Sequence, residues 1–265
     1  MKKVIFLLPG CLWLQIARAQ QQQGKVVYER TMQLKVMLQG VGEEVAQMMP
    51  TSRKDKIEVL FGKGQALQRA VNEEDAQADM ADAESGMHVK FVMAGNDEQT
   101  FSSFKDSRTV KQMELGGKQY LLTDSIHKMN WKITGETTTI LNYPCQQAVA
   151  QHIGKRIATT MKDGEMKTTE VADTSNMVAW FTMQIPVPAG PELQGQLPGL
   201  ILGLDMGTLT YRAVSLSPDV DLAELKEPTK GKRITTEEFN KERDKMFKEM
   251  QQRTSGRATT IKIGQ

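Results

Sequence analysis

A two-residue alternation of apolar and polar side chains runs through this sequence from residue 25 to residue 217. The alternating segments are short, rich in β-branched and aromatic residues, and separated by turns that contain Gly, Pro, Asn or Asp. We therefore expect a mainly β (α+β) fold with one or two helices, built on a large antiparallel sheet that curves into a half-barrel or folds as a sandwich. The predicted strands are residues 25–38, 56–61, 65–71, 87–93, 99–105, 109–115, 118–123, 131–134, 137–141, 145–152, 156–161, 165–171, 178–185, 200–205 and 208–217.

Two hairpins are marked by their turns. Gly62-Lys63-Gly64 separates residues 56–61 from 65–71, and Asp163-Gly164 separates 156–161 from 165–171. Glycine takes the positive φ that tight hairpin turns require, so each pair of segments is expected to form neighbouring strands. Residues 72–86 hold six acidic side chains and little that can be buried, which predicts a solvated loop.

The segment QGQLPGLILGLDMG, residues 194–207, joins a Pro/Gly turn to an apolar run. Apolar residues occupy successive positions in this run, at Leu200, Ile201, Leu202 and Leu204. This pattern predicts a strand that is covered on both faces. One face is expected to meet the main core. The other is expected to be covered either by a helix or by a molecule that the protein carries.

A helix is predicted from Thr235 to about Ser255. Thr235 and Glu238 have the spacing of a capping box, and one face collects the apolar side chains of Phe239, Met246, Phe247 and Met250. We expect this amphipathic helix to pack on the sheet and to cover the second face of residues 200–205. Residues 257–263 have the composition of a last strand.

The first residues resemble a signal peptide. Lys2 and Lys3 precede an apolar stretch, and Ala17-Arg18-Ala19 offers small residues at the positions a signal peptidase reads. We expect cleavage after Ala19, a periplasmic or secreted protein, and a single β-rich domain over residues 20–265. The alternative is a lipoprotein cleaved before Cys11. Nothing after residue 19 is long and apolar enough to cross a bilayer.

Removing the signal changes the charge and the cysteine count. The loss of Lys2, Lys3 and Arg18 lowers the 34 basic residues to 31, against 32 acidic ones, so the net charge of +2 becomes −1. Without a basic surplus, nucleic acid is not an expected partner. Cys145 is then the sole cysteine, which rules out an intramolecular disulfide. We interpret it as a small buried apolar residue; the alternatives are a reactive nucleophile, an intermolecular disulfide and a metal ligand.

The sequence contains no recognisable catalytic motif. Its three histidines form neither an HExxH motif nor a pair at metal-ligand spacing, and no G-x-S-x-G elbow or phosphate-binding glycine loop is present. We therefore expect a non-enzymatic protein with no catalytic residue, no metal and no cofactor. The 17 methionines leave a copper-binding protein as a minor alternative, because thioethers suit Cu(I), but flexible core filling is their ordinary use.

Several motifs occur in the order and spacing of a known family. They are Trp131-Lys132-Ile133-Thr134-Gly135, Tyr143-Pro144-Cys145, Ala179-Trp180-Phe181-Thr182, Ile185-Pro186 with Gly190-Pro191, and Leu197-Pro198-Gly199-Leu200-Ile201. In these residues the chain resembles the GLPGLI family over roughly residues 25–255. The resemblance implies a secreted or envelope protein of Bacteroidota without an assigned biochemical function, and it supplies no catalytic residue. The sequence departs from the family at Gln196, where the family has its first glycine.

Three functions follow from these observations. The first is a non-enzymatic envelope or secreted protein that binds an apolar small molecule, lipid or peptide in the concave face of the sheet. The second is a structural or protein-interaction module of the envelope with a sealed core, which binds an envelope protein through a strand edge. The third is the metal-binding protein. For the first, the candidate ligand-binding residues are Trp131, Trp180, Leu197, Pro198, Gly199, Leu200 and Leu202.

Overall fold

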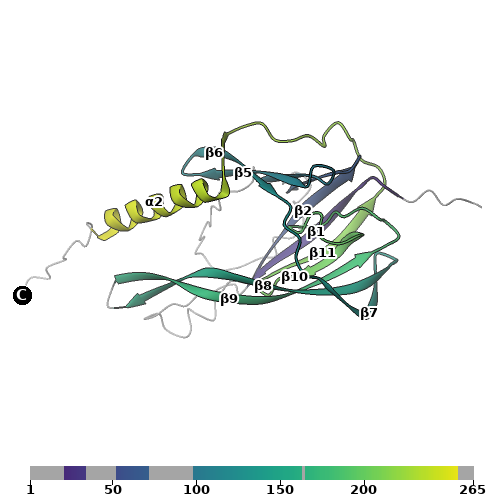
Figure 1. Cartoon of the computed structure of the whole chain (residues 1–265), viewed down its shortest axis with the longest axis horizontal. Coiled ribbons are helices and arrows are strands. Elements are labelled where there is room, and N and C mark those ends of the chain that lie inside the picture. The colour runs from purple at the N-terminus through teal and green to yellow at the C-terminus, as the bar shows by residue number, and fades with distance from the viewer. Residues whose placement is uncertain (1–20, 34–51, 72–97, 163–164, 256–265) are drawn as a thin grey trace, which may run out of the picture.

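The computed structural model describes residues 21–33, 52–71, 98–162 and 165–255. These residues form one twelve-stranded sheet and one helix (Figure 1). The strand order is β12-β6-β5-β4-β3-β2-β1-β11-β10-β9-β8-β7, and every neighbouring pair is antiparallel except β12 with β6. The elements are β1 (Gly24–Gln33), β2 (Ser52–Gly62), β3 (Gln65–Ala70), β4 (Gln99–Ser103), β5 (Arg108–Leu115), β6 (Lys118–Ser125), β7 (Lys132–Ile140), β8 (Tyr143–Lys162), β9 (Glu165–Thr182), β10 (Leu200–Asp205), β11 (Leu209–Ser217), β12 (Lys232–Ile234) and α2 (Thr236–Ser255).

The sheet is open and strongly curved. β6 and β7 lie near opposite ends of the strand order, yet only residues 126–131 connect them. Strands about 4.8 Å apart would place β6 and β7 about 48 Å apart in a flat sheet, whereas a linker of this length reaches about 25 Å. The sheet must therefore curl until its two ends approach, and Figure 1 shows β5 and β6 facing β8 and β9. This confirms the predicted mainly β fold, in the open half-barrel form.

The predicted hairpin at Gly62-Lys63-Gly64 is confirmed. β2 and β3 pair from Gly62 opposite Gln65 to Ile57 opposite Ala70, and the turn residues Lys63 and Gly64 have φ values of 50° and 72°. Most other strands also begin and end within a few residues of the prediction. The end of the predicted strand 25–38, the acidic segment 72–86, the predicted strand 87–93 and the predicted strand 257–263 lie outside the described residues.

Three strands each join two segments that were predicted to be separate. The segments 131–134 and 137–141 form the single strand β7, which is interrupted by an irregularity between Ile133 and Thr137, where Gly135 has a φ of 90°. β8 likewise merges two predicted segments, and β9 merges two more. Their ladder continues without a register shift from Gln146 opposite Phe181 to Lys162 opposite Glu165. Gly154, Lys155 and Asp173, which lie between the predicted segments, are paired within this ladder.

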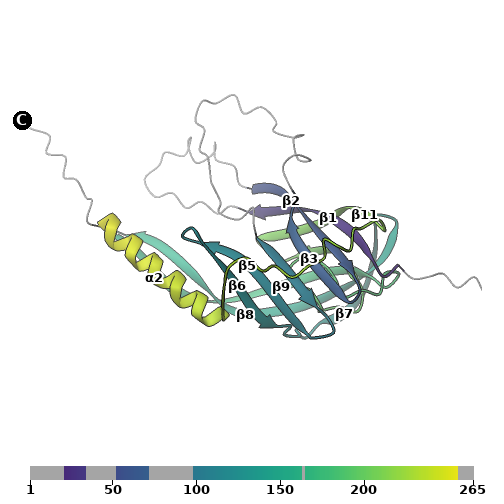
Figure 2. The same cartoon turned by 90° about the horizontal axis from the view of Figure 1, so that it is seen from above.

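Helix α2 is capped as predicted, but it covers a different surface. The Thr235 Oγ1 accepts a hydrogen bond from the Glu238 backbone N–H, and Glu238 Oε2 accepts one from the Thr235 N–H. Phe239 packs edge-on against Tyr120 of β6, with ring centroids 5.6 Å apart. The middle of α2 also meets the turn between β5 and β6, where a Cβ on Gly116 would lie 3.0 Å from the Met246 Sδ, and α2 leads away from β10 in both views (Figures 1 and 2). The expectation that it covers the second face of residues 200–205 is therefore wrong.

The short strand β12, which was not predicted, explains where α2 lies. Its residues pair in parallel with β6, from Lys232 opposite Tyr120 to Ile234 opposite Leu122. Ile234 and Phe239 then complete a small apolar cluster with Tyr120 and Leu122, which holds the start of the helix. Among the described residues, no helix combines the length and apolar character needed to cross a lipid bilayer.

Residues 218–231 cross the outer surface of the sheet as an extended strap that leads from β11 to β12 (Figure 2). Leu225 is buried against Leu60, Leu67 and Phe101 from three neighbouring strands. Ion pairs add to this contact, because Arg69 pairs with both Glu58 and Glu224, and Glu227 pairs with both Arg108 and Arg233. The strap thus covers apolar side chains that would otherwise face water.

Candidate functional site

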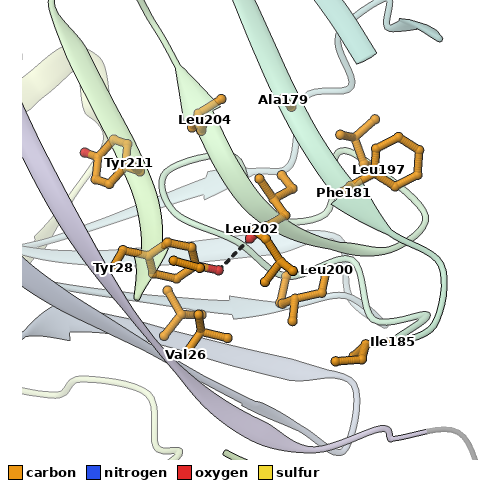
Figure 3. Close-up of a cluster of buried hydrophobic side chains, with 14 of the residues drawn as sticks. Val26, Tyr28, Ala179, Phe181, Ile185, Leu197, Leu200, Leu202, Leu204 and Tyr211 are labelled. Carbon is orange, nitrogen blue, oxygen red and sulfur yellow. Dashed lines mark hydrogen bonds between the residues drawn. The ribbon is translucent and has the colours of Figure 1, made fainter. Parts of the chain in front are cut away.

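The charge-free strand after Pro198 is buried on both faces by the chain itself. Leu200 and Leu202 have no exposed surface, and Leu197 is 4% exposed. They belong to one core cluster that also contains Ile185, Val187 and Ala189 from the Pro/Gly-rich segment 183–199. Figure 3 shows Leu200 and Leu202 near Val26 and Tyr28 of β1, and Leu197 beside Phe181. We call residues 183–199 the plug loop, because they supply the cover that was expected from a helix or a carried molecule.

Backbone hydrogen bonds fix the plug loop against β10. The Leu200 N–H donates to the Ile185 carbonyl at 3.0 Å, and the Ile201 N–H donates to the Ala189 carbonyl at 2.9 Å. Two glycines allow this close approach. A Cβ on Gly190 would lie 2.6 Å from the Cβ of Ile201, and one on Gly199 would lie 2.2 Å from the carbonyl oxygen of Thr182. Of the two predicted turn residues, Pro198 is exposed and Gly199 is buried.

An irregularity in β10 explains the consecutive apolar positions. The register with β9 shifts between Ile201 and Gly203, so that Leu202 lies opposite no residue of β9. The Ile201 carbonyl accepts a hydrogen bond from the Tyr28 hydroxyl at 2.6 Å. Burial raises the pKa of Tyr28, which keeps the hydroxyl protonated as a donor. The buried carbonyl beside the shift is therefore satisfied within the core.

The two tryptophans predicted to bind a ligand, Trp131 and Trp180, are half-buried and pack against this core cluster. Trp180 lies against Gly203, where a Cβ would be 3.3 Å from its Cδ1 atom. The indole N–H of Trp131 donates to Gln196 Oε1 at 3.4 Å. The structure thus brings Trp131, Trp180, Leu197, Leu200 and Leu202 into one region, where their surroundings are side chains of the same protein.

Gln196, the departure from the GLPGLI pattern, joins the plug loop to the linker between β6 and β7. Its Oε1 accepts a hydrogen bond from the Met129 N–H at 2.9 Å, and its Nε2 donates to the His127 carbonyl at 2.7 Å. The Lys128 ammonium also donates to the carbonyl of Gly195. A glycine at position 196 would lack the side-chain bonds, so this residue ties the plug loop to the linker that spans the open side of the half-barrel.

A polar network that the sequence analysis missed holds the plug loop from the opposite side. Glu192 Oε1 accepts hydrogen bonds from Gln68 Nε2 at 2.7 Å and from the Tyr211 hydroxyl at 3.0 Å. The Glu192 N–H donates to Gln68 Oε1 at 2.8 Å. Glu192 has a φ of 56°, a conformation that costs a non-glycine residue free energy and is held here by three bonds. Its side chain remains exposed, whereas Gln68 and Tyr211 are buried.

Arg30 and Asp55 extend this network across the sheet. Arg30 lies opposite both Tyr211 of β11 and Asp55 of β2 in the strand register. Its Nε and Nη2 donate to the two Asp55 carboxylate oxygens at 2.7 and 2.5 Å. The bond to Asp55 raises the pKa of Arg30, and burial followed by the charge of Glu192 raises the pKa of Tyr211. One sequence signal could have found Arg30: its two-residue spacing from Tyr28 and Val26 places it on the buried face of β1.

Cys145 is buried, as the preferred interpretation held. It is 1% exposed, and its Sγ donates to the Tyr143 carbonyl at 3.4 Å. Burial raises the pKa of the thiol, which disfavours the nucleophilic and metal-binding thiolate.

Within the described residues, no group of three or more His, Cys, Asp and Glu side chains could hold a metal ion. The hollow along α2 is lined by Lys241, Asp244, Lys245, Lys248 and Glu249, which makes it a charged surface.

Besides the three-residue end strand β12, two parts of the sheet expose strand edges. β7 ends the sheet, and its side chains are exposed from Lys132 to Thr139, but the irregularity at residues 134–136 interrupts the regular edge. β8 and β9 instead continue beyond their other neighbours. β7 pairs with β8 only as far as Val149, and β10 pairs with β9 only as far as Val178. We call residues 150–162 and 165–177 the arm; in Figure 1 these two segments project as a two-stranded ribbon.

Part of this region is similar to a family of unknown function. A family profile described as "Protein of unknown function (Porph_ging)" matches residues 131–203. This stretch runs from β7 through the arm and the plug loop into β10, and it contains the motifs that resemble the GLPGLI family. No curated protein matches the chain.

Two solved structures have a similar course of the backbone. The first, "Structure of PNGF-II in C2 space group", has a TM-score of 0.49 and 15% sequence identity. The match covers 83% of this chain and 32% of the solved chain. The second, "Structure of PNGF-II in P21 space group", has a TM-score of 0.49 and 16% sequence identity. The match covers 84% of this chain and 34% of the solved chain. The chain thus spans about a third of the length of these solved chains.

Proposed function

We propose that this protein is a non-enzymatic interaction module of the cell envelope or of the secreted fraction, with a sealed core, and that it binds another protein through the edges of the arm. Export would follow removal of residues 1–19 with the signal peptide. The observation that carries the proposal is the arm itself, since residues 150–162 and 165–177 pair only with each other among the described residues.

The packing of the plug loop favours this function over an apolar carrier. A ligand at Leu200 and Leu202 would have to displace the plug loop and return Ile185, Val187 and Leu197 to water. At about 1.5–3 kcal/mol for each buried side chain, the cost is roughly 5–9 kcal/mol. That is comparable with the whole stability of an ordinary domain, about 5–15 kcal/mol. The plug loop is therefore best understood as a permanent part of the core.

The arm suits recognition of an extended polypeptide. A two-stranded ribbon is marginally stable alone in water, and its outer N–H and C=O groups can accept a further strand. Strand addition of this kind uses main-chain hydrogen bonds for affinity. The irregularity in β7 argues against the same use of that edge, because such features interrupt regular pairing. We therefore assign partner binding to the arm.

The proposal is tested by shortening the arm. Gly154 and Asp173 face each other in the ladder, so replacing residues 155–172 with Asn-Gly would join them through a two-residue turn. The tagged mature protein and the shortened variant are each cross-linked in the envelope fraction, and the arm amides of any recovered complex are followed by hydrogen exchange. We expect a stoichiometric partner that protects arm amides and that the shortened variant loses.

The matched control keeps both edges. Replacing Asp163-Gly164, which connect β8 to β9 in the sequence, with Asn-Gly leaves both arm segments at full length, so this variant should retain the partner. The shortened variant should also unfold at the same temperature as the original, because residues 155–162 and 165–172 pair only with each other among the described residues. A partner that stays bound to the shortened but folded variant would refute the assignment of binding to the arm.

A further inference from the structure

The strap, residues 218–231, is attached to the sheet by side chains and not by its backbone. Within the described part of the chain its backbone hydrogen bonds are local: the Glu224 N–H donates to the Asp221 carbonyl at 3.1 Å, and the Lys226 N–H donates to the Glu224 carbonyl at 2.8 Å. The strands beneath it, from β2 to β5, pair along ladders that contain no strap residue. The strap can therefore leave without breaking a ladder hydrogen bond of the sheet.

The surface beneath the strap is apolar at its centre, and we call it the strap site. Leu225 inserts there against the apolar cluster formed by β2, β3 and β4. Next to it, Leu222 packs over Gly62, where a Cβ would lie 2.6 Å from the Leu222 Cδ2 atom. The strap site thus accepts leucine side chains from an extended chain, because the missing side chain at Gly62 leaves room for one of them.

Two arginines make the strap site complementary to acidic side chains. Arg69 pairs with Glu224 of the strap and, through its Nε at 2.6 Å, with Glu58 of the sheet. Arg108 Nη2 donates to Glu227 Oε2 at 2.6 Å. When the strap leaves, Arg69 keeps its bond to Glu58, and Arg108 is exposed enough to be hydrated, so no buried charge is left unpaired. The ion pairs to the strap lie near the surface and hold it only weakly.

We infer that the strap site binds an extended acidic segment of another protein, in which a leucine lies between two carboxylates, and that the strap closes the site by occupying it. The strap supplies the pattern, with Leu225 between Glu224 and Glu227. A competing segment binds only those molecules whose strap has left, so the measured affinity rises in proportion to the open fraction. The strap site lies on β2 to β5, apart from the arm in the strand order, and the inference does not depend on binding at the arm.

Binding of a labelled peptide to the full chain tests the inference. The peptide has the sequence of residues 219–229 and carries a fluorophore, and its anisotropy is measured with the original protein and with Leu225→Ala. Loss of the buried leucine should raise the open fraction, and with it the affinity for the peptide, by about 10- to 100-fold. Glu224→Gln removes one ion pair near the surface and keeps the leucine, so it should raise the affinity about two- to fivefold. Thermal unfolding verifies that each variant is folded.

Matched controls define where the peptide binds. A peptide with alanine in place of its second leucine should bind about tenfold more weakly or less. Adding Arg108→Gln to the Leu225→Ala/Glu227→Gln variant, whose strap no longer binds this arginine, should weaken peptide binding, whereas adding Arg212→Gln, at an exposed arginine of β11, should not. If folded Leu225→Ala and Glu224→Gln bind the peptide no better than the original protein, or if the alanine peptide binds equally well, the strap is a fixed part of the surface and the inference is refuted.

Discussion

The hydroxyl of Tyr211 donates a hydrogen bond to Glu192 Oε1 at 3.0 Å and thereby links β11 to the tip of the plug loop. Gln68 of β3 binds the same oxygen, so one exposed carboxylate joins the plug loop to strands on both sides of β1 and β2. The network holds a residue with positive φ in place. Its effect on stability can be measured one bond at a time.

Tyr211→Phe should destabilise the fold without opening the core. It removes one hydrogen bond to a charged group, which is worth about 1.5–3 kcal/mol, and leaves the aromatic ring buried. Chemical denaturation should show the loss as a lower midpoint with an unchanged slope. Tyr143→Phe, at a half-buried tyrosine outside this network, serves as the control. Equal stability of Tyr211→Phe and the original protein would show that the bond to Glu192 contributes nothing.

Gln196→Gly should weaken the attachment of the plug loop to the linker between β6 and β7. Three side-chain bonds, to the Met129 N–H, the Trp131 indole N–H and the His127 carbonyl, are lost together. At about 1 kcal/mol for each bond, unfolding should become easier by roughly 3 kcal/mol. Hydrogen exchange at Met129 should accelerate more than exchange at Leu121 in the core of β6. Unchanged exchange at Met129 would contradict the role given to Gln196.

Leu202→Ala should be among the costliest substitutions in the chain. The side chain is fully buried, and its loss should cost about 2–5 kcal/mol because the surrounding core collapses only partly. Pro198→Ala, four residues earlier and exposed, should change the free energy of unfolding far less. If Leu202→Ala proved as mild as Pro198→Ala, the strand would lie against open space and not against a packed core.

The strap on the outer surface should loosen in acid. The hydrogen bond from Arg108, followed by that from Arg233, lowers the pKa of Glu227 below its ordinary value of 4.5. A carboxylate with a depressed pKa in the folded state adds stability above its unfolded pKa, and this contribution is lost as pH falls through the folded pKa. Glu227→Gln should therefore cost stability at pH 7 and little at pH 3. The control is Asp219→Asn, an exposed carboxylate on the same strap; an equal loss from Glu227→Gln at both pH values would contradict the prediction.

Cys145 should be unreactive until the protein unfolds. The thiol is buried in the core, and burial raises its pKa, so the thiolate is scarce and shielded. A bulky thiol reagent should label the protein in denaturant and not in native buffer. Rapid stoichiometric labelling of the folded protein would restore the alternative of a reactive cysteine.

The local features of this fold could be predicted from the sequence, because neighbouring residues determine them. The turn at Gly62-Lys63-Gly64 and the capping box between Thr235 and Glu238 are examples. The apolar run at Leu200–Leu204 also predicted a strand covered on both faces, which is what the structure has. The identity of the cover could not be read from the run itself, since a helix, a ligand and a loop all exclude water equally well.

The remaining features depend on contacts between residues that are far apart in the sequence. Glu192 and Gln68 are separated by 124 positions, and nothing near either residue indicates that they meet. The same is true of β12, whose three residues form a strand only because β6 lies beside them. The Pro/Gly content of residues 186–199 is typical of a loop, but the place of this loop in the core follows from the curl of the whole sheet.

Side chains of the protein itself fill the core around β10, and this is the central claim. Mass spectrometry of an organic extract of the natively purified mature protein tests it most directly. We predict that the extract contains no apolar compound in stoichiometric amount and that the extracted protein keeps its unfolding temperature. A lipid or other hydrophobic molecule recovered at one equivalent per chain, with a fall in unfolding temperature on its removal, would contradict the sealed core and restore the carrier function.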